Sequence, residues 1–141
     1  MQVSAKYEIV SWREAEAFPA DDALRCQRVV VHKRFAGGLE ADGVATVLIT
    51  SADLELPVLS VGTPRSGGYV AQDHITGRLD GRVGSFVIHH GGHQRGDAPE
   101  LFGVIVPGSG TDDLKGISGS VRFPHDPDRP GLMIIDYQLP G

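Results

Sequence analysis

The chain has 141 residues and a formal net charge of -5, from 13 Lys and Arg against 18 Asp and Glu. This length predicts one domain over residues 1–141. The acidic balance argues against nucleic acid as a partner, because phosphate binding needs a basic surface. No apolar run approaches the roughly 20 residues that cross a bilayer, so no membrane is expected. A polar start without a secretory signal and a single cysteine favour a cytoplasmic location.

Beta-branched residues dominate the apolar content. Val and Ile together outnumber Leu two to one, and such side chains fit a pleated strand better than a helix. The 19 Gly and 9 Pro residues are plentiful enough to supply many tight turns. The composition therefore predicts a small all-β protein.

Segments of strand length follow one another from the N-terminus. The first apolar run covers residues 7–12, and residues 13–17 have a helix propensity that predicts a short helical turn near the N-terminus. Two further strands are predicted at 25–35 and 43–50, with a tight turn over 39–43 between them.

Residues 51–68 are the least regular stretch, with Pro57 and Pro64 among them. Its apolar island, 54–59, could form an edge strand, since Pro cannot donate within a central ladder. Long loops are often functional. We interpret the stretch as a surface insertion, with a lid or a contact between subunits as the alternatives.

The second half of the chain contains the strongest hairpin signal, Asp80-Gly81. Counting the whole chain gives about eight strands at short spacing, which leaves no room for parallel crossovers. We therefore expect a single eight-stranded antiparallel β-barrel, whose closure removes exposed edges. The strands predicted in this half cover 69–79, 82–90, 101–106, 114–123 and 132–139.

Alternation along each strand predicts which side chains point into the barrel. On each strand, the more apolar of the two faces should be the inner one. The inward residues predicted in this way include Tyr69, Asp73, Ile75, Phe86, Ile88, His90, Ile135 and Tyr137, with Lys33 as an odd polar member.

Asp73 and His90 are the candidate catalytic residues. Burying a charge without a partner is costly, so an inward Asp73 should pair with His90 or Lys33. Paired titratable groups in an apolar cavity acquire pKa values suited to acid–base chemistry. A polar cluster that only fixes the register of a filled barrel is the alternative.

Three histidines lie close together in the sequence, at His89, His90 and His93. Neighbouring residues of a strand point to opposite faces, so His89 and His90 cannot share one ion. The spacing also differs from the ligand pattern of cupin barrels. We expect no metal site and no cofactor.

Several sequence blocks together resemble the bacterial DUF3224 family over nearly the whole chain. They are ITGRLDGRVGSFVIHH at 75–90, VPGSGT at 106–111 and LKGISG at 114–119, with YEIVSW at 7–12 and IDY at 135–137. The resemblance implies an eight-stranded antiparallel barrel like those of allene oxide cyclase and dirigent-type proteins. It also implies Glu where this chain has the shorter Asp73, His at the position of His90, and a shorter stretch than 51–68.

We expect a small-molecule-binding barrel that acts as a cofactor-free isomerase or cyclase on an apolar substrate in its interior. Fold does not determine function, so a non-catalytic ligand carrier and a structural or interaction barrel are the alternatives. A homodimer is the expected assembly. The substrate-binding residues would be Tyr69 and Tyr137, which orient the ligand, together with Phe86, Ile88, Ile75, Ile135 and Lys33.

Overall fold

The protein is a closed eight-stranded barrel in which each strand pairs antiparallel with the next and β8 returns to β1. This confirms the predicted fold class. The computed structural model describes residues 1–18, 25–51, 66–95, 98–124, 128 and 131–141. Its elements are β1 (Gln2–Phe18), β2 (Arg25–Gly37), β3 (Leu39–Ser51), β4 (Ser66–Leu79), β5 (Arg82–Arg95), β6 (Ala98–Ile105), the short 3-10 helix η1 (Asp112–Leu114), β7 (Ser118–Arg122) and β8 (Leu132–Gln138).

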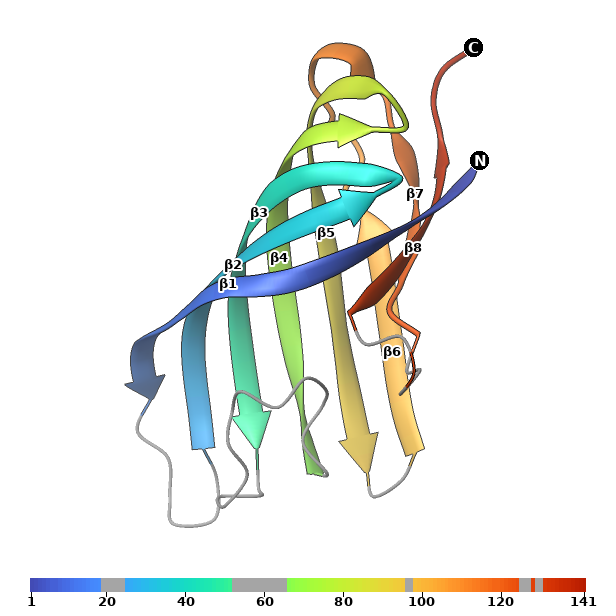
Figure 1. Ribbon diagram of the computed structural model, residues 1–141. Coiled ribbons are helices and arrows are strands. Elements are labelled where there is room, and N and C mark those ends of the chain that lie inside the picture. Colours follow the sequence, from blue (N-terminus) through green and yellow to red (C-terminus); the bar gives the residue numbers. More distant parts are fainter. Residues whose placement is uncertain (19–24, 52–65, 96–97, 125–127, 129–130) are drawn as a thin grey trace.

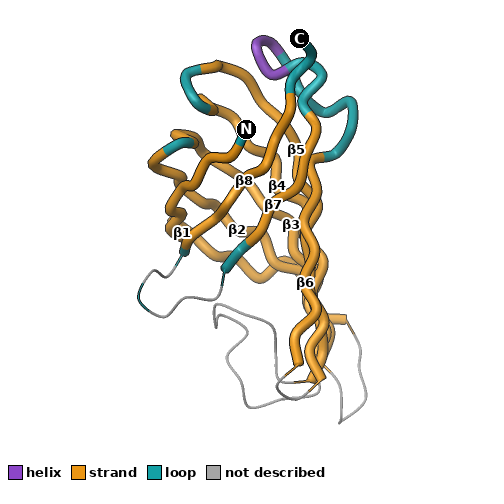
Figure 2. Tube along the Cα trace, turned by 90° about the vertical axis from the view of Figure 1, so that its right-hand side faces the viewer, coloured by secondary structure: helices purple, strands orange, loops and turns teal. Residues whose placement is uncertain are grey.

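The strands differ greatly in length, and this gives the barrel two unlike ends. Figure 1 shows β1 starting beside β8 at the N-terminus and crossing the long ribbons of β2–β5 as it runs away from β8. The C-terminus and η1 lie together at one end of the molecule, as Figure 2 shows. Tyr69, near the start of β4, lies toward the other end. No helix among the described residues is long and apolar enough to cross a membrane.

The N-terminal helical turn predicted at 13–17 is wrong, because β1 continues as a strand to Phe18. Trp12 pairs with Val31, and Glu14 pairs with Val29 of β2. A short segment gains little from helix propensity alone, since helix nucleation is costly. Pairing with the apolar β2 therefore decides its conformation, at the expense of two irregularities in the register.

Several strands are longer than predicted, and the structure also differs at one turn and at the start of β7. The turn between β2 and β3 lies at Gly38 rather than over 39–43, and Gly37 before it takes a φ of 116°, which favours glycine. The strand predicted at 114–123 begins only at Ser118. Leu114 and Ile117 instead belong to η1 and the turn after it, where both are buried in the core.

The predicted Asp80-Gly81 hairpin is confirmed, and both of its residues have positive φ, at 51° and 84°. Such a turn matches the twist of the strands that it joins. Of the stretch 51–68, Ser51 ends β3 and residues 66–68 begin β4. The expectations for 52–65, including an edge strand, lie outside the described residues.

Burial along the strands alternates as expected, and β3 alternates over most of its length. One apolar cluster fills the end of the barrel near η1, and a smaller one lies toward the other end. The first cluster includes Phe35, Leu39, Ile75, Leu79, Phe86, Ile88, Ile105, Ile135 and Tyr137. The second consists of Val29, Val31, Ala45 and Ile49, with Trp12 and Tyr69 packed against it.

Candidate functional site

A buried carboxylate joins three strands inside the barrel. Asp73 of β4 accepts a hydrogen bond from Lys33 Nζ of β2 at 2.8 Å, and its other oxygen lies 3.0 Å from His90 Nε2 of β5. The three residues are only 1%, 8% and 6% exposed, in the order Asp73, Lys33, His90. The prediction that Asp73 points inward and is paired is confirmed, and both candidate partners bind it.

Tyr69 extends this arrangement toward the outside. Its hydroxyl lies 3.3 Å from His90 Nδ1, and the two rings meet edge to face. A carboxylate only accepts hydrogen bonds, so we assign the proton of neutral His90 to Nε2, which donates to Asp73. Nδ1 is then an acceptor for the Tyr69 hydroxyl. We call the four residues Lys33, Asp73, His90 and Tyr69 the polar chain.

Small residues on neighbouring strands make room for the polar chain. Directly paired residues of antiparallel strands share a face of the sheet, so a bulky partner would compete for the same interior space. Each inward polar side chain of β4 and β5 has a small partner. Ala71 and Gly103 pair with His90 on its two sides. Asp73 and Tyr69 each have a small partner on one side, Ala45 and Gly92, and an isoleucine on the other.

Two aromatic residues that the sequence analysis did not select cover the polar chain. The Phe123 ring lies 4.7 Å from that of His90 and 5.9 Å from that of Tyr7. Lys33 Nζ lies 5.3 Å from the centre of the Tyr7 ring, a distance that allows a cation–π contact. Phe123 comes two residues after the buried Val121, so both side chains fall on the same face of an extended chain. This alternation could have predicted that Phe123 points inward.

The environment shifts the pKa values of these groups in different directions. Burial by itself would raise the pKa of Asp73, but the hydrogen bond from His90 and the charge of Lys33 outweigh it and hold the pKa below its ordinary value. Burial, the neighbouring Tyr7 and the charge of Asp73 raise the pKa of Tyr69 to about 12. At neutral pH the site therefore holds an ionised carboxylate and a protonated phenol.

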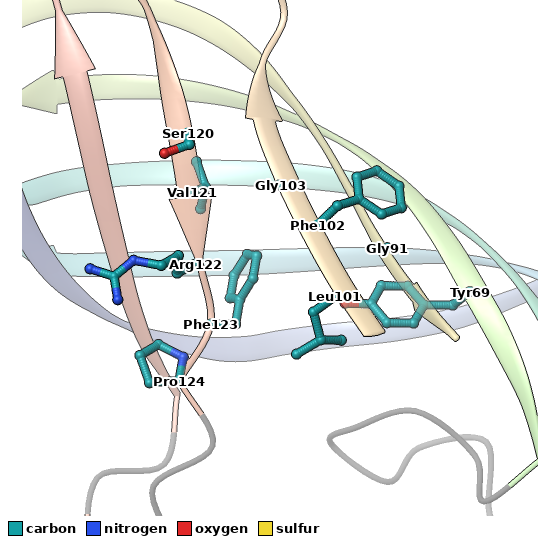
Figure 3. A pocket seen from close by; sticks show the side chains of 10 residues that line it. All are labelled: Tyr69, Gly91, Leu101, Phe102, Gly103, Ser120, Val121, Arg122, Phe123 and Pro124. Atoms are coloured by element: carbon teal, nitrogen blue, oxygen red, sulfur yellow. The ribbon is translucent and has the colours of Figure 1, made fainter. Parts of the chain in front are cut away.

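A pocket of about 500 Å³ opens through the barrel wall between β6 and β7. Among the described residues, Val104 and Ser120 are the one pair of these two strands. Gly103 still packs against the Val121 backbone, so the strands separate beyond that contact, on the side away from η1. Leu101 shares the inward face of the buried Ile105, yet it is 54% exposed because β7 does not cover it. Figure 3 shows Leu101 and Phe123 facing each other across this opening, with Tyr69 behind them.

The pocket and the polar chain meet at Tyr69 and Phe123. Both residues line the pocket, together with Leu101, Phe102 and Val121. Tyr69 also contacts His90 through its hydroxyl, and Phe123 contacts the His90 ring. A molecule in the pocket would therefore touch the outer member of the polar chain first.

The structure places the remaining predicted substrate-binding residues elsewhere. Tyr137 points into the end of the barrel near η1, where its hydroxyl donates to Asp80 Oδ2 at 3.0 Å and accepts from Arg82 Nη1 at 3.4 Å. The four aliphatic and aromatic residues of the prediction are at most 1% exposed and belong to the apolar cluster. They are Ile75, Phe86, Ile88 and Ile135, and none of them lines the pocket between β6 and β7.

The adjacent histidines lie on opposite faces, as the strand period predicts. His89 is exposed on the outside and His90 is buried, while His93 beyond them is exposed. Among the described residues, no three His, Cys, Asp or Glu side chains lie close enough together to hold a metal ion.

Comparison with known proteins identifies the family. The family described as "Protein of unknown function (DUF3224)" matches residues 3–137. A crystal structure of a DUF3224 protein of unknown function from Shewanella oneidensis has a TM-score of 0.83 and 24% sequence identity, and the match covers 100% of this chain and 98% of that one. At this identity the likeness establishes the fold alone. No curated protein matches the chain. The chain belongs to the DUF3224 family.

Proposed function

We propose that this barrel binds an apolar small molecule in the pocket between β6 and β7 and moves a proton on it, as a cofactor-free isomerase or cyclase. One observation carries the proposal. The hydrogen-bonded chain that starts at the buried Lys33–Asp73 pair ends at Tyr69, whose ring lines that pocket. The implied likeness to allene oxide cyclase-like barrels is an analogy in the same direction.

The pocket suits an apolar ligand. Its size is in the range of small-molecule sites, and such sites are lined mainly by apolar and aromatic side chains with a few polar groups. Leu101 and Phe102 are about half exposed in the free protein. Covering them would contribute about 25 cal/mol for each Å² of apolar surface removed from water.

A proton relay through Tyr69 can act without any cofactor. In the first step a C–H bond of the substrate breaks, its proton goes to the Tyr69 oxygen, and the Tyr69 proton passes to His90 Nδ1. The electron pair stays on the substrate. In the second step His90 returns its proton to Tyr69, which protonates a different substrate atom. The substrate is isomerised, and the protein ends as it began.

The deeper residues of the chain position and stabilise this relay. Asp73 holds His90 Nε2 and so fixes Nδ1 toward Tyr69. The imidazolium that forms lies beside the Asp73 carboxylate, while Lys33 keeps that carboxylate ionised between turnovers. Because the pKa of Tyr69 is about 12, a free tyrosinate would be rare at neutral pH. Transfer to His90 in the same step avoids that species.

A non-catalytic carrier is the second candidate, and one observation favours it. Asp73 and His90 are buried behind Tyr69 and do not line the pocket. A ligand that only needs an apolar shelter would use Leu101, Phe102 and Phe123 in the same way. The two functions therefore share the pocket and differ in the role of the Tyr69 hydroxyl.

Binding is tested with 2-tetralone, an apolar bicyclic ketone with acidic C–H bonds beside its carbonyl group. Leu101→Trp should fill the opening and weaken binding about tenfold or more, as measured by NMR titration. Leu48→Trp is the matched control, because Leu48 is 44% exposed on the outer face and does not line the pocket. Equal binding by both variants would place the ligand elsewhere and overturn the proposal.

Catalysis is tested by the exchange of the acidic C–H bonds of 2-tetralone with deuterium in D₂O. The wild type should accelerate this exchange, and Tyr69→Phe should reduce the acceleration about 100-fold or more, the range expected for loss of general acid–base catalysis. The phenyl ring is retained, so the pocket should still bind the ketone. Binding without acceleration by the wild type would favour the carrier.

A further inference from the structure

The side chain of Gln27 has one polar atom that no hydrogen bond accounts for. Gln27 lies on the inner face of β2 and is 6% exposed. Its Nε2 donates to Glu14 Oε1 at 2.7 Å. Its Oε1 is buried and has no hydrogen-bond partner among the described residues. Buried polar atoms without partners are rare in native proteins, and each one needs an explanation.

The orientation of this amide is determined by its neighbour. A carboxylate such as Glu14 can only accept hydrogen bonds, so the NH₂ group of Gln27 must face it. Rotating the amide by half a turn would bring two acceptors together and break the hydrogen bond to Glu14. The atom that points away from Glu14 is therefore the oxygen Oε1, which is an acceptor. It belongs to a residue that is only 6% exposed.

Gln27 does not itself line the pocket, but it shares a row of inward residues with two that do, Tyr69 and Leu101. It pairs with Ile49 on β3, and Ile49 pairs with Tyr69 on β4. Tyr69 pairs with Gly92 on β5, and Gly92 pairs with Leu101 on β6. One row thus runs across five strands from Gln27 to the pocket wall, and Gly92 adds no side chain between Tyr69 and Leu101.

We propose that Gln27 Oε1 recognises the ligand by accepting a hydrogen bond from a hydroxyl group at one end of an apolar molecule. This inference rests on the proposed function and adds the class of substrate to it. Gln27 and Tyr69 are two strands apart, which is roughly 10 Å at a strand spacing of about 4.8 Å. A compact hydroxylated molecule of about two fused rings, in contact with Ile49, matches this span.

A neutral hydroxyl fits this position better than an ammonium group. The amide oxygen carries no net charge, and the charges of Lys33 and Asp73 cancel each other at 2.8 Å. An ammonium group would therefore lose its hydration without gaining a buried counter-ion. The carboxylate of Glu14 is the acidic group nearest to Gln27, but Glu14 is exposed, so water screens its charge.

The experiment compares three ketones that differ at one position: 6-hydroxy-2-tetralone, 6-methoxy-2-tetralone and 6-aminomethyl-2-tetralone. Dissociation constants are measured by calorimetry on the wild type and on Gln27→Leu. The wild type should bind the hydroxy compound about tenfold more tightly than the methoxy compound, as one hydrogen bond of about 1 kcal/mol or slightly more allows. In Gln27→Leu the ratio of the two constants should fall to about one.

The near-isosteric Gln27→Met serves as a second variant, so that a folding defect of Gln27→Leu does not decide the result. A hydroxyl preference that survives both substitutions would overturn the inference, as would tighter binding of the aminomethyl compound to the wild type. If 2-tetralone binds but the hydroxyl group gives no advantage, this inference alone fails. If none of the ketones binds the wild type, the proposed function fails, and the inference fails with it.

Discussion

The two ends of the barrel interior are built by the same alternation of residues and differ in what that alternation places inside. Near η1, residues such as Phe86 and Ile135 are fully buried against one another. Toward the opposite end, the inner positions hold Asp73, His90 and Tyr69 beside a smaller apolar cluster. One end is filled by apolar side chains, whereas the other carries a hydrogen-bonded chain that leads to a pocket.

The difference bears on what each end contributes. Packed apolar side chains stabilise the fold directly. A buried ion pair such as Lys33–Asp73 adds little net stability, because desolvation of both charges offsets their attraction. Apolar residues of similar volume would serve the fold equally well at that place. The apolar end therefore contributes most to stability, and the polar end is the place where we propose the chemistry.

The largest expected effect comes from a substitution at the apolar end of the barrel. Phe86→Ala should lower the free energy of unfolding by about 3–5 kcal/mol, because it removes a fully buried aromatic ring and leaves a cavity. Val83→Ala on the same strand is the control, since Val83 is 51% exposed and should change stability by no more than about 0.5 kcal/mol. Urea denaturation measures both. A loss below about 1 kcal/mol for Phe86→Ala would contradict the assignment of this end to stability.

A slightly smaller effect is expected at the polar end. Asp73→Asn should cost about 3 kcal/mol at pH 7, because it leaves the Lys33 ammonium buried without its counter-charge. The double variant Lys33→Met/Asp73→Leu should be more stable than the single one, since neither charge remains buried. Asp42→Asn is the control, because that side chain is 82% exposed in a surface ion pair.

The pH dependence of the Asp73→Asn effect has a defined sign. The folded state holds the pKa of Asp73 below its ordinary value, so the carboxylate stabilises the fold at pH values above the unfolded pKa of about 3.9. This contribution is lost as the pH falls through the lower folded pKa. The stability difference between wild type and Asp73→Asn should therefore be constant near neutrality and shrink below about pH 4. A difference that stayed constant into strong acid would rule out this account.

The smallest expected effect concerns the titration of Tyr69, at the polar end of the barrel. The pKa of Tyr69 is raised to about 12, so Tyr69 favours the folded state below the unfolded pKa of about 10, and this contribution is lost as the pH rises toward 12. After a rapid pH jump, tyrosinate absorbance should contain a component with a midpoint near 12. That component should be missing in Tyr69→Phe. Its persistence would assign the high pKa to Tyr7 or Tyr137 instead.

Much of the candidate site follows from the period of a strand. Because alternate residues share a face, the apolar parity of β4 and β5 was enough to direct Asp73 and His90 inward, and the cost of a lone buried charge required a partner. The same rule put Lys33 inside and made it a candidate partner of Asp73, which its ion pair with Asp73 confirms. The wrong helical turn at 13–17 shows the limit of local propensity, since pairing with β2 decided that segment.

By itself, the sequence determined the strand content, the antiparallel barrel and the inner faces of β2, β4, β5 and β8, because hydrophobic alternation and turn residues act over a few neighbouring positions. Only the tertiary structure decided which inward residues meet. Phe123 lies against His90, Gln27 shares a row with Leu101, and the wall opens between β6 and β7. These features depend on pairing between strands far apart in the chain, and on how closely each pair of strands stays joined along its length.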